Sequence, residues 1–295
     1  MYFCSMNSIY RDIKVILTQG NLSEGEAKTI ALMLLEKVAG LPAAKALIAD
    51  GKDLLCRRQS LLELAARISK GEPVQYVLGE ADFCGMTLKV KPGVLIPRPE
   101  TEELVNWIVE ETSSLKPQAS HLLDIGTGSG CIAIALARKL ENAKVEAWDV
   151  SEEALQIAQE NATRNGVSVK LKKVDVLSNH NLNDNLDFGC DNFNVIVSNP
   201  PYICEEEKEG MEKNVLEHEP SVALFVPNED PLLFYRKIGA LALQLLGEGG
   251  LLFFEINRRF GKEVVALLQE MGYREMELRQ DLFGNDRMVK AIKPQ

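Results

Sequence analysis

The sequence has few of the residues that usually build metal centres and disulfide frameworks. Only three histidines occur, at positions 121, 180 and 218, and no two of them have the spacing of metal ligands. The six cysteines are scattered without a CxxC pair. In a chain of 295 residues this pattern is typical of reduced thiols in a cytoplasmic protein. We therefore expect neither a metal site nor disulfide bonds.

Positive charge is also in short supply, and long apolar runs are absent. Lys and Arg number 33 against 43 Asp and Glu, which gives a net charge of −10. This deficit argues against wide capture of nucleic acid, and an acidic body suits a basic protein or loop as partner. No apolar run reaches the length of a membrane span, and residues 1–10 do not resemble a secretory signal. We expect a cytoplasmic protein with no stable nucleic acid and no membrane partner.

Residues 1–75 carry helical patterns without any cluster of catalytic groups. Apolar periodicity predicts helices over 6–19 and 27–38, and Ser23 with Glu26 forms a capping box before the second. A short helix is predicted over 41–51 and a fourth helix over 53–69. We interpret this region as a small helical bundle that serves partner recognition.

Residues 76–97 change character and are predicted to link two domains. The turn signal Lys91-Pro92-Gly93 predicts a β-hairpin that pairs residues 83–90 with residues 94–96. Pro99 disfavours helix at Arg98, so a helix is expected over 101–112.

From His121 onward strand and helix patterns alternate, which indicates an α/β fold with a mostly parallel, Rossmann-like, seven-stranded sheet in a domain of residues 98–295. The last two strands are separated by a connection too short for a parallel crossover, so they should pair antiparallel. The polar residues 178–191 are expected to form a surface loop. Strands are predicted at 121–125, 144–149, 168–174, 193–198, 250–256, 273–279 and 286–292, and helices at 130–140, 151–165, 231–246 and 261–271.

A glycine-rich loop follows the first of these strands, in the segment Asp124-Ile-Gly-Thr-Gly-Ser-Gly130. Ligands of such sheets bind beyond the carboxyl ends of the strands, and glycines allow close backbone approach. The spacing Gly-x-Gly-x-Gly differs from the Gly-x-Gly-x-x-Gly of dinucleotide enzymes. It favours a nucleoside cofactor, although a dinucleotide or an ordinary turn also fits.

Two acidic residues end the next strands. Asp149 has the position of an acid that accepts hydrogen bonds from both ribose hydroxyls. Asp175 and Val176 suit the adenine, with an acid for the exocyclic amine and an apolar wall for the ring. A simple strand-end turn remains the alternative at this second position.

The segment Asn199-Pro200-Pro201-Tyr202 follows a buried strand and is the most informative motif. The Asn199 side-chain oxygen and the Pro200 carbonyl can both accept from one planar NH2 group, which orients its lone pair. Pro200 and Pro201 stiffen the backbone, and Tyr202 offers a flat face. With the glycine loop, the motif indicates methyl transfer from S-adenosylmethionine to an amide or an adenine amine.

The chain resembles the PrmC/HemK family, which methylates the N5 amide of a glutamine in class I peptide chain release factors. The resemblance is carried by residues 71–79, 95–102, 124–130, 199–202, 219–220 and 281–287. It implies a class I S-adenosylmethionine-dependent methyltransferase fold and a helical domain that docks the release factor, whose target is the glutamine of a GGQ motif.

The resemblance also implies the roles of individual residues. Asn199, Pro200 and Tyr202 would be catalytic, and Pro201 would join them in binding the glutamine. The implied cofactor-binding residues are Gly126, Thr127, Gly128, Ser129, Gly130, Asp149, Val176 and Asn199.

Two segments depart from the family pattern, Phe225-Val226-Pro227 and Asn257-Arg258-Arg259-Phe260. We expect both to lie in peripheral loops. Arg98 and Glu100 either line the substrate entrance or form an ion pair in the linker. Glu205-Glu206-Glu207 is expected to be a solvated face.

Two other functions fit parts of these patterns. An adenine-N6 nucleic-acid methyltransferase also uses an Asn-Pro-Pro-Tyr type motif, but the acidic charge and the lack of a basic recognition domain disfavour it. A non-catalytic binding module with the same fold would need none of Gly126, Asp149 and Asn199.

Overall fold

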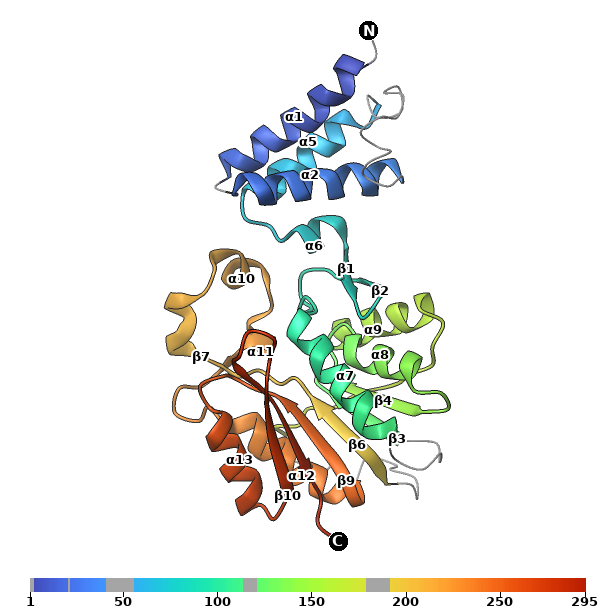
Figure 1. The fold of residues 1–295 in the computed structure, drawn as a ribbon, viewed down its shortest axis with the longest axis vertical. Coiled ribbons are helices and arrows are strands. Elements are labelled where there is room, and N and C mark those ends of the chain that lie inside the picture. Colours follow the sequence, from blue (N-terminus) through green and yellow to red (C-terminus); the bar gives the residue numbers. More distant parts are fainter. Residues whose placement is uncertain (1–2, 21, 41–55, 114–120, 179–191) are drawn as a thin grey trace. The chain divides into compact units, whose positions relative to one another are not determined.

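The computed structural model describes residues 3–20, 22–40, 56–113, 121–178 and 192–295. The chain divides into two compact units (Figure 1). The helical unit comprises Met1–Glu80 with Glu212–His218, and the sheet unit comprises Ala81–Met211 with Glu219–Gln295. The segment Glu212–His218 belongs to the helical unit although it lies far along the sequence. The hydrophobic pattern of the sequence does not predict this assignment. The predicted helix over 41–51 and the predicted loop over 178–191 lie almost wholly outside the described residues.

The helical unit is built from amphipathic helices whose apolar stripes meet in one core. The capping box predicted before α2 is present, because Ser23 N donates to Glu26 Oε2 at 3.0 Å and Glu26 N donates to Ser23 Oγ at 3.3 Å. Ile13 of α1, Leu34 of α2 and Leu61 of α5 are fully buried in this core. The helices of this core are α1 (Phe3–Gln19), α2 (Glu24–Ala39), α5 (Arg58–Ser69) and α6 (Val74–Leu78). Helix α10 (Lys213–His218) also belongs to the unit but contributes no residue to the core.

The predicted hairpin exists but its strands and turn were wrongly placed. Strand β1 (Glu80–Phe83) pairs with β2 (Met86–Lys89) across a two-residue turn. Cys84 and Gly85 have φ angles of 49° and 70°, the pattern of the primed turns that match the twist of a hairpin. Lys91-Pro92-Gly93 does form a turn, yet it lies after the hairpin. The sequence does not show that Cys84 adopts a positive φ angle. The prediction therefore placed the hairpin turn at Pro92-Gly93, a pair that is typical of turns.

The seven-stranded sheet of the sheet unit has the order β10-β11-β9-β6-β3-β4-β5. Its inner strands are parallel, and β11 runs antiparallel to β10, as predicted. Strand β11 also runs antiparallel to β9, a pairing that the sequence did not predict. A separate short pair joins β7 (Ile203–Cys204) to β8 (Phe225–Val226). The strands of the large sheet are β3 (His121–Ile125), β4 (Lys144–Asp149), β5 (Lys170–Lys173), β6 (Phe193–Ser198), β9 (Leu246–Glu255), β10 (Arg274–Gln280) and β11 (Asp286–Ile292).

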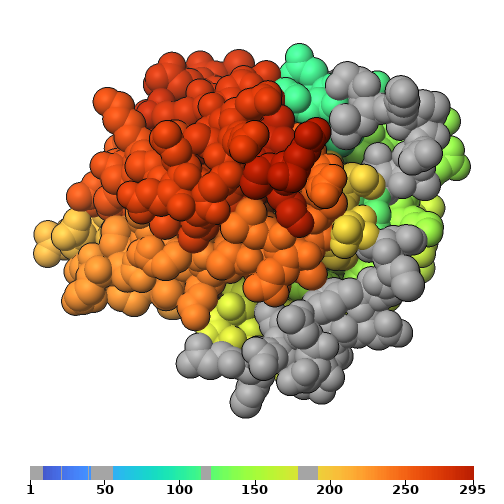
Figure 2. All heavy atoms as spheres, turned by 90° about the horizontal axis from the view of Figure 1, so that it is seen from below, coloured from blue at the N-terminus to red at the C-terminus, as the bar shows by residue number. Residues whose placement is uncertain are grey.

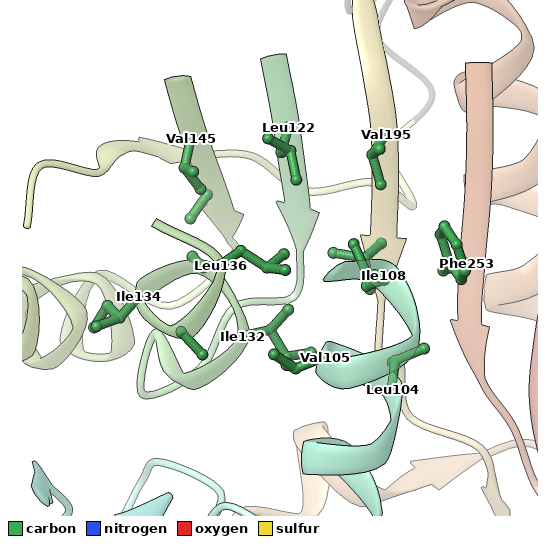
Figure 3. Packing of buried hydrophobic residues seen from close by; sticks show 14 of the residues in the cluster. Leu104, Val105, Ile108, Leu122, Ile132, Ile134, Leu136, Val145, Val195 and Phe253 are labelled. Atoms are coloured by element: carbon green, nitrogen blue, oxygen red, sulfur yellow. The ribbon is translucent and has the colours of Figure 1, made fainter. Parts of the chain in front are cut away.

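Helices cover both faces of the sheet, which explains why the central strands β3, β6 and β9 contain continuous apolar runs. Neighbouring residues of one strand, such as Leu122 and Leu123, enter different cores because side chains alternate across a strand. On one face lie α7 (Pro99–Ser113), α8 (Cys131–Lys139) and α9 (Glu152–Arg164), and on the other α12 (Leu233–Leu245) and α13 (Gly261–Glu270). Figure 3 shows side chains of α7 and α8 facing Leu122, Val145, Val195 and Phe253 of the strands.

The register of the parallel strands brings three candidate segments to one edge of the sheet. Ile125, the last residue of β3, lies opposite Trp148 of β4 and Ser198 of β6. The residues that follow these three, Gly126, Asp149 and Asn199, therefore leave the sheet side by side. Ser198 also lies opposite Phe254 of β9, which places Glu255 in the same row. Figure 2 views the molecule from below, where the orange to red C-terminal elements form one continuous surface.

Candidate active site

The glycine loop is open at two of its glycines and tightly packed at the third. Gly126 and Gly128 have φ angles of 77° and 55°, and a Cβ added to either would meet no atom within 4 Å. At Gly130, with φ of 81°, a Cβ would lie 2.9 Å from Ile134 Cδ1 and 3.1 Å from Ala158 Cβ. The first two glycines thus leave free space beside the backbone, while the third lets α8 and α9 approach each other.

Asp149 is held against this loop by backbone donors. Its Oδ2 accepts from Gly128 N at 2.8 Å, and its Oδ1 accepts from Ser151 N at 2.9 Å. Burial raises the pKa of this carboxyl group, and the backbone hydrogen bonds partly offset the effect. Each carboxylate oxygen keeps a further lone pair, so Asp149 could accept from two neighbouring hydroxyl groups. The open loop and this fixed acid fit a nucleoside.

Asp124 supports the loop from below instead of facing a ligand. Its Oδ2 accepts from Thr127 Oγ1 at 2.6 Å and from Ala133 N at 3.3 Å. Among the described residues its other oxygen is buried and has no hydrogen-bond partner. Burial raises the pKa of Asp124 to about 7. The side chains of Thr127 and Ser129 are buried as well, so these residues contribute mainly through their backbone.

Val176, the candidate adenine contact, lies partly buried against the core that contains Ile125 and Trp148. Asp175 before it is exposed, and its Oδ1 accepts from Leu177 N at 2.9 Å. Val176 is thereby available as an apolar surface near the ends of β3 and β4. The side chain of Asp175 shapes the turn and still has acceptor capacity.

Asn199 is part of a hydrogen-bonded chain that ends on a buried acid. Its Nδ2 donates to Thr101 Oγ1 at 3.3 Å, and Thr101 Oγ1 donates to Glu255 Oε2 at 2.7 Å. Tyr202 donates its hydroxyl to Glu255 Oε1 at 3.1 Å. Thr101 and Glu255 are only 2% and 1% exposed. Both ends of the Asn-Pro-Pro-Tyr motif are therefore connected to one carboxyl group.

The electrostatics of this chain keep Tyr202 neutral. Burial and the adjacent Glu255 both raise the pKa of the Tyr202 phenol, so it cannot serve as a base near neutral pH. Burial also raises the pKa of Glu255, while hydrogen bonds from the two hydroxyl groups and the charge of Arg287 lower it. The motif presents acceptors and a ring face, with no ionised tyrosine.

The two segments that depart from the family pattern are not peripheral, which corrects the expectation from sequence. Asn257 Nδ2 donates to the Tyr202 carbonyl at 3.0 Å and to Glu207 Oε2 at 2.9 Å. Phe225 and Val226 form β8, which pairs with the strand directly after Tyr202. Both departures thus hold the chain that leaves the motif. Sequence separation concealed this, because the contacts join residues far apart along the chain.

Two expectations about charged residues are also revised. Arg98 pairs with buried Glu219 at 2.5 Å, and Glu219 Oε2 also accepts from Ile96 N at 3.3 Å. Arg98 therefore has an acidic partner, but this partner is Glu219 and not Glu100. Glu206 is exposed as predicted, yet it binds Arg259 Nη1 at 3.0 Å, so part of the acidic run is an ion-pair site.

Sequence reasoning missed Thr101, Glu219 and Glu255 as parts of the site. An acid at the end of an apolar strand, as at Glu255, was the available signal, because a buried carboxyl group needs partners. Thr101 gave no signal of its own. Its importance depends on contacts with residues 98 and 154 positions away.

Comparison with known proteins gives two family matches and a similar fold. Residues 104–220 match the Methyltransferase small domain family, and residues 11–79 match the PrmC N-terminal domain family. The hMettl16 catalytic domain, solved in complex with a 3′UTR hairpin, has a similar fold, with a TM-score of 0.56 and 18% identity. It covers 79% of this chain and 82% of that one.

Curated relatives are similar over most of their length. The release factor glutamine methyltransferase of Bacteroides thetaiotaomicron is 45% identical over 269 residues, which are 90% of this chain and 92% of the relative. That of Flavobacterium psychrophilum is 49% identical over 76% of this chain and 77% of the relative. With this identity and coverage, the chain belongs to the release factor glutamine methyltransferase family.

Proposed function

We propose that the protein transfers a methyl group from S-adenosylmethionine to the side-chain amide nitrogen of a glutamine in class I peptide chain release factors. The observation that carries this proposal is the hydrogen bonding of the Asn199 side chain. Its Nδ2 is engaged by Thr101, and in the described part of the chain nothing donates to its Oδ1 or to the Pro200 carbonyl. Two acceptors next to each other suit one NH2 group.

The cofactor would lie at the edge formed by the ends of β3, β4 and β6. When bound, S-adenosylmethionine supplies a methyl group on a positively charged sulfur, whose bond to that carbon breaks with its electron pair left on sulfur. Asp149 would accept from the ribose hydroxyls, and Val176 would contact the adenine. The open space beside Gly126 and Gly128 supports this placement.

The protein's task at the substrate is to orient a weak nucleophile. The lone pair of an amide nitrogen is delocalised into its carbonyl, so the amide plane must be fixed while the nitrogen forms its new bond. Asn199 Oδ1 and the Pro200 carbonyl would accept both NH2 hydrogens, and Tyr202 would hold the flat face. Such positioning can supply up to about 7–11 kcal/mol of barrier reduction. The released proton passes to water.

The remaining parts suit recognition of a protein substrate. Residues 1–75 would dock the release factor, residues 76–97 would link the domains, and residues 98–295 would perform the chemistry. The compact helical unit and the match to the PrmC N-terminal domain support this division. The net charge of −10 favours a basic loop as partner, and the scattered cysteines without a CxxC pair favour a cytoplasmic location.

Mass spectrometry of the reaction product tests the proposal. The full chain is incubated with S-adenosylmethionine and a class I release factor, and the peptide that carries the GGQ glutamine is fragmented. We expect one added methyl group on that glutamine and none on a substrate with glutamine replaced by glutamate. Label transferred to RNA or DNA adenine, with none on the release factor, would contradict the proposal and favour the adenine-N6 alternative.

A further inference from the structure

The orientation of the Asn199 side chain decides what the motif can recognise. A side-chain amide has an acceptor on one side and two donors on the other, and the two ends have nearly the same shape. With Oδ1 toward the substrate, Asn199 accepts from an NH2 group. With Nδ2 toward the substrate, it would meet that group donor to donor. Backbone rigidity from Pro200 and Pro201 does not choose between these orientations.

The hydrogen bonds around Glu255 determine which of the two orientations the Asn199 amide adopts. Thr101 and Tyr202 both donate their hydroxyl hydrogens to the Glu255 carboxyl group, at 2.7 and 3.1 Å. Thr101 has a single hydroxyl hydrogen, and this hydrogen is used in the hydrogen bond to Glu255. The Thr101 oxygen can then only accept, and the group of Asn199 that faces it must be the donor Nδ2. The Asn199 oxygen is left on the opposite side.

The burial of Thr101 and Glu255 strengthens the preference for one orientation of the Asn199 amide. Thr101 and Glu255 are almost completely excluded from solvent, so water cannot replace either partner. If the Asn199 side-chain amide were flipped, its Oδ1 would face the lone pairs of Thr101 Oγ1. This part-buried contact would then contain two acceptors and no hydrogen bond. Burial raises the pKa of Glu255, and the hydrogen bonds from Thr101 and Tyr202 together with the charge of Arg287 partly offset this rise.

We propose that Thr101, held by Glu255, is a positioning residue that locks the Asn199 amide with its oxygen toward the substrate. The inference rests on the proposed function, because it explains how that site accepts from a glutamine NH2 group. Thr101 acts through Asn199 and does not touch the substrate. The family resemblance of residues 95–102 gives no reason for a threonine at this position; the hydrogen-bonded chain does.

Kinetics of three threonine variants test the lock. Thr101→Val keeps the shape and removes the hydroxyl, and we expect kcat to fall about 10- to 100-fold, the effect of losing one buried hydrogen bond. The Kd for S-adenosylmethionine and the KM for the release factor should stay within about twofold. Thr101→Ser restores the hydroxyl and should recover kcat to within about threefold of wild type.

Thr112→Val is the matched control. Thr112 lies on the same helix, is 5% exposed, and donates to the Ile108 carbonyl at 2.7 Å, remote from the site. It should retain full kcat while losing a comparable buried hydroxyl. Equal losses of kcat in both valine variants would overturn the lock and indicate a general effect of the helix. Wild-type kcat in Thr101→Val would overturn it as well.

A spectroscopic readout separates this inference from the proposed function. In protein labelled with ¹⁵N-asparagine, the Asn199 side-chain signals are assigned by their absence in Asn199→Ala. We expect one Nδ2 hydrogen of the wild type to exchange slowly with solvent, and to lose that protection in Thr101→Val but not in Thr112→Val. Rapid exchange of both hydrogens in the wild type would overturn the lock. Slow exchange without any methylation of release factors would leave the lock intact and contradict the function.

Discussion

At the scale of single residues, the side chains proposed for cofactor binding and for turnover are held in place in different ways. Asp149 is fixed by backbone N–H groups of Gly128 and Ser151, so its geometry is set before any ligand arrives. Asn199 is fixed by a side chain, Thr101, from a helix distant in sequence. The first residue stands beside the glycine loop and the second beside the proline pair. Their substitutions should therefore change different constants.

Asn199→Ala and Asp149→Ala form a matched pair for this division. Asn199→Ala removes an acceptor that orients the amide, so kcat should fall about 100- to 1000-fold with an unchanged Kd for S-adenosylmethionine. Asp149→Ala should weaken cofactor binding by about 1.5–3 kcal/mol, the value of a hydrogen bond to a charged group. Calorimetry and steady-state kinetics measure both. Near-normal turnover in Asn199→Ala, or unchanged cofactor affinity in Asp149→Ala, would refute the respective role.

The sequence predicted the residues at this scale that belong to a local motif. Asn199 and Asp149 each follow an apolar strand, and that position alone indicates the ligand edge of a parallel sheet. Thr101 and Glu255 could not be assigned in this way. Their meaning depends on which strand lies beside which, and only the register of β6 and β9 brings Glu255 next to the end of the motif.

At the scale of elements, the glycine loop combines two physical requirements. Gly126 borders open space, whereas Gly130 borders Ile134 and Ala158 of the packed helices. Both have positive φ, which costs any other L-residue about 1–2 kcal/mol. A methyl group at Gly126 would enter the space proposed for the cofactor, and a methyl group at Gly130 would crowd Ile134 and Ala158.

Gly126→Ala and Gly130→Ala should therefore separate affinity from stability. Gly130→Ala adds crowding to strain, so we expect a loss of about 2–4 kcal/mol in the free energy of unfolding. Gly126→Ala should lose only about 1–2 kcal/mol but weaken S-adenosylmethionine binding about tenfold or more. Urea titration and calorimetry measure the two quantities. The opposite ranking, with Gly126→Ala the less stable protein, would contradict the division of the loop.

Long elements were predictable and short ones were not. The central strands β3, β6 and β9 contain buried apolar runs, because both faces of the sheet are covered there, so these strands stand out in the sequence. The short helix α6 spans only five residues, fewer than a periodic pattern needs. The hairpin depends on the backbone angles of Cys84 and Gly85, which composition does not reveal.

At the scale of the whole molecule, each unit buries its own core. Every residue of the core around Leu34 belongs to the helical unit, and every residue of the two cores beside the large sheet belongs to the sheet unit. No helix within the described residues is long and apolar enough to cross a membrane. In the same part of the chain, no group of three His, Cys, Asp or Glu could hold a metal ion.

Separate cores predict that damage to one unit spares the other's ligand. Leu34 and Leu252 are both fully buried, the first in the helical unit and the second in the sheet unit, and leucine-to-alanine changes in such sites cost about 2–5 kcal/mol. A ligand stabilises only the folded unit that binds it. In differential scanning calorimetry, saturating S-adenosylmethionine should thus raise the Tm of the transition weakened by Leu252→Ala. It should leave unchanged the transition weakened by Leu34→Ala.

The two leucine variants also test what the helical unit does. Leu34→Ala should keep the wild-type Kd for S-adenosylmethionine and raise the KM for the release factor, because the proposed docking surface belongs to the weakened unit. Leu252→Ala should instead weaken binding of the cofactor, since Leu252 lies opposite Ile196 of β6, whose end forms part of the proposed cofactor edge. If Leu34→Ala weakened cofactor binding as much as Leu252→Ala, the two units would fold as one body and docking could not be separated from catalysis.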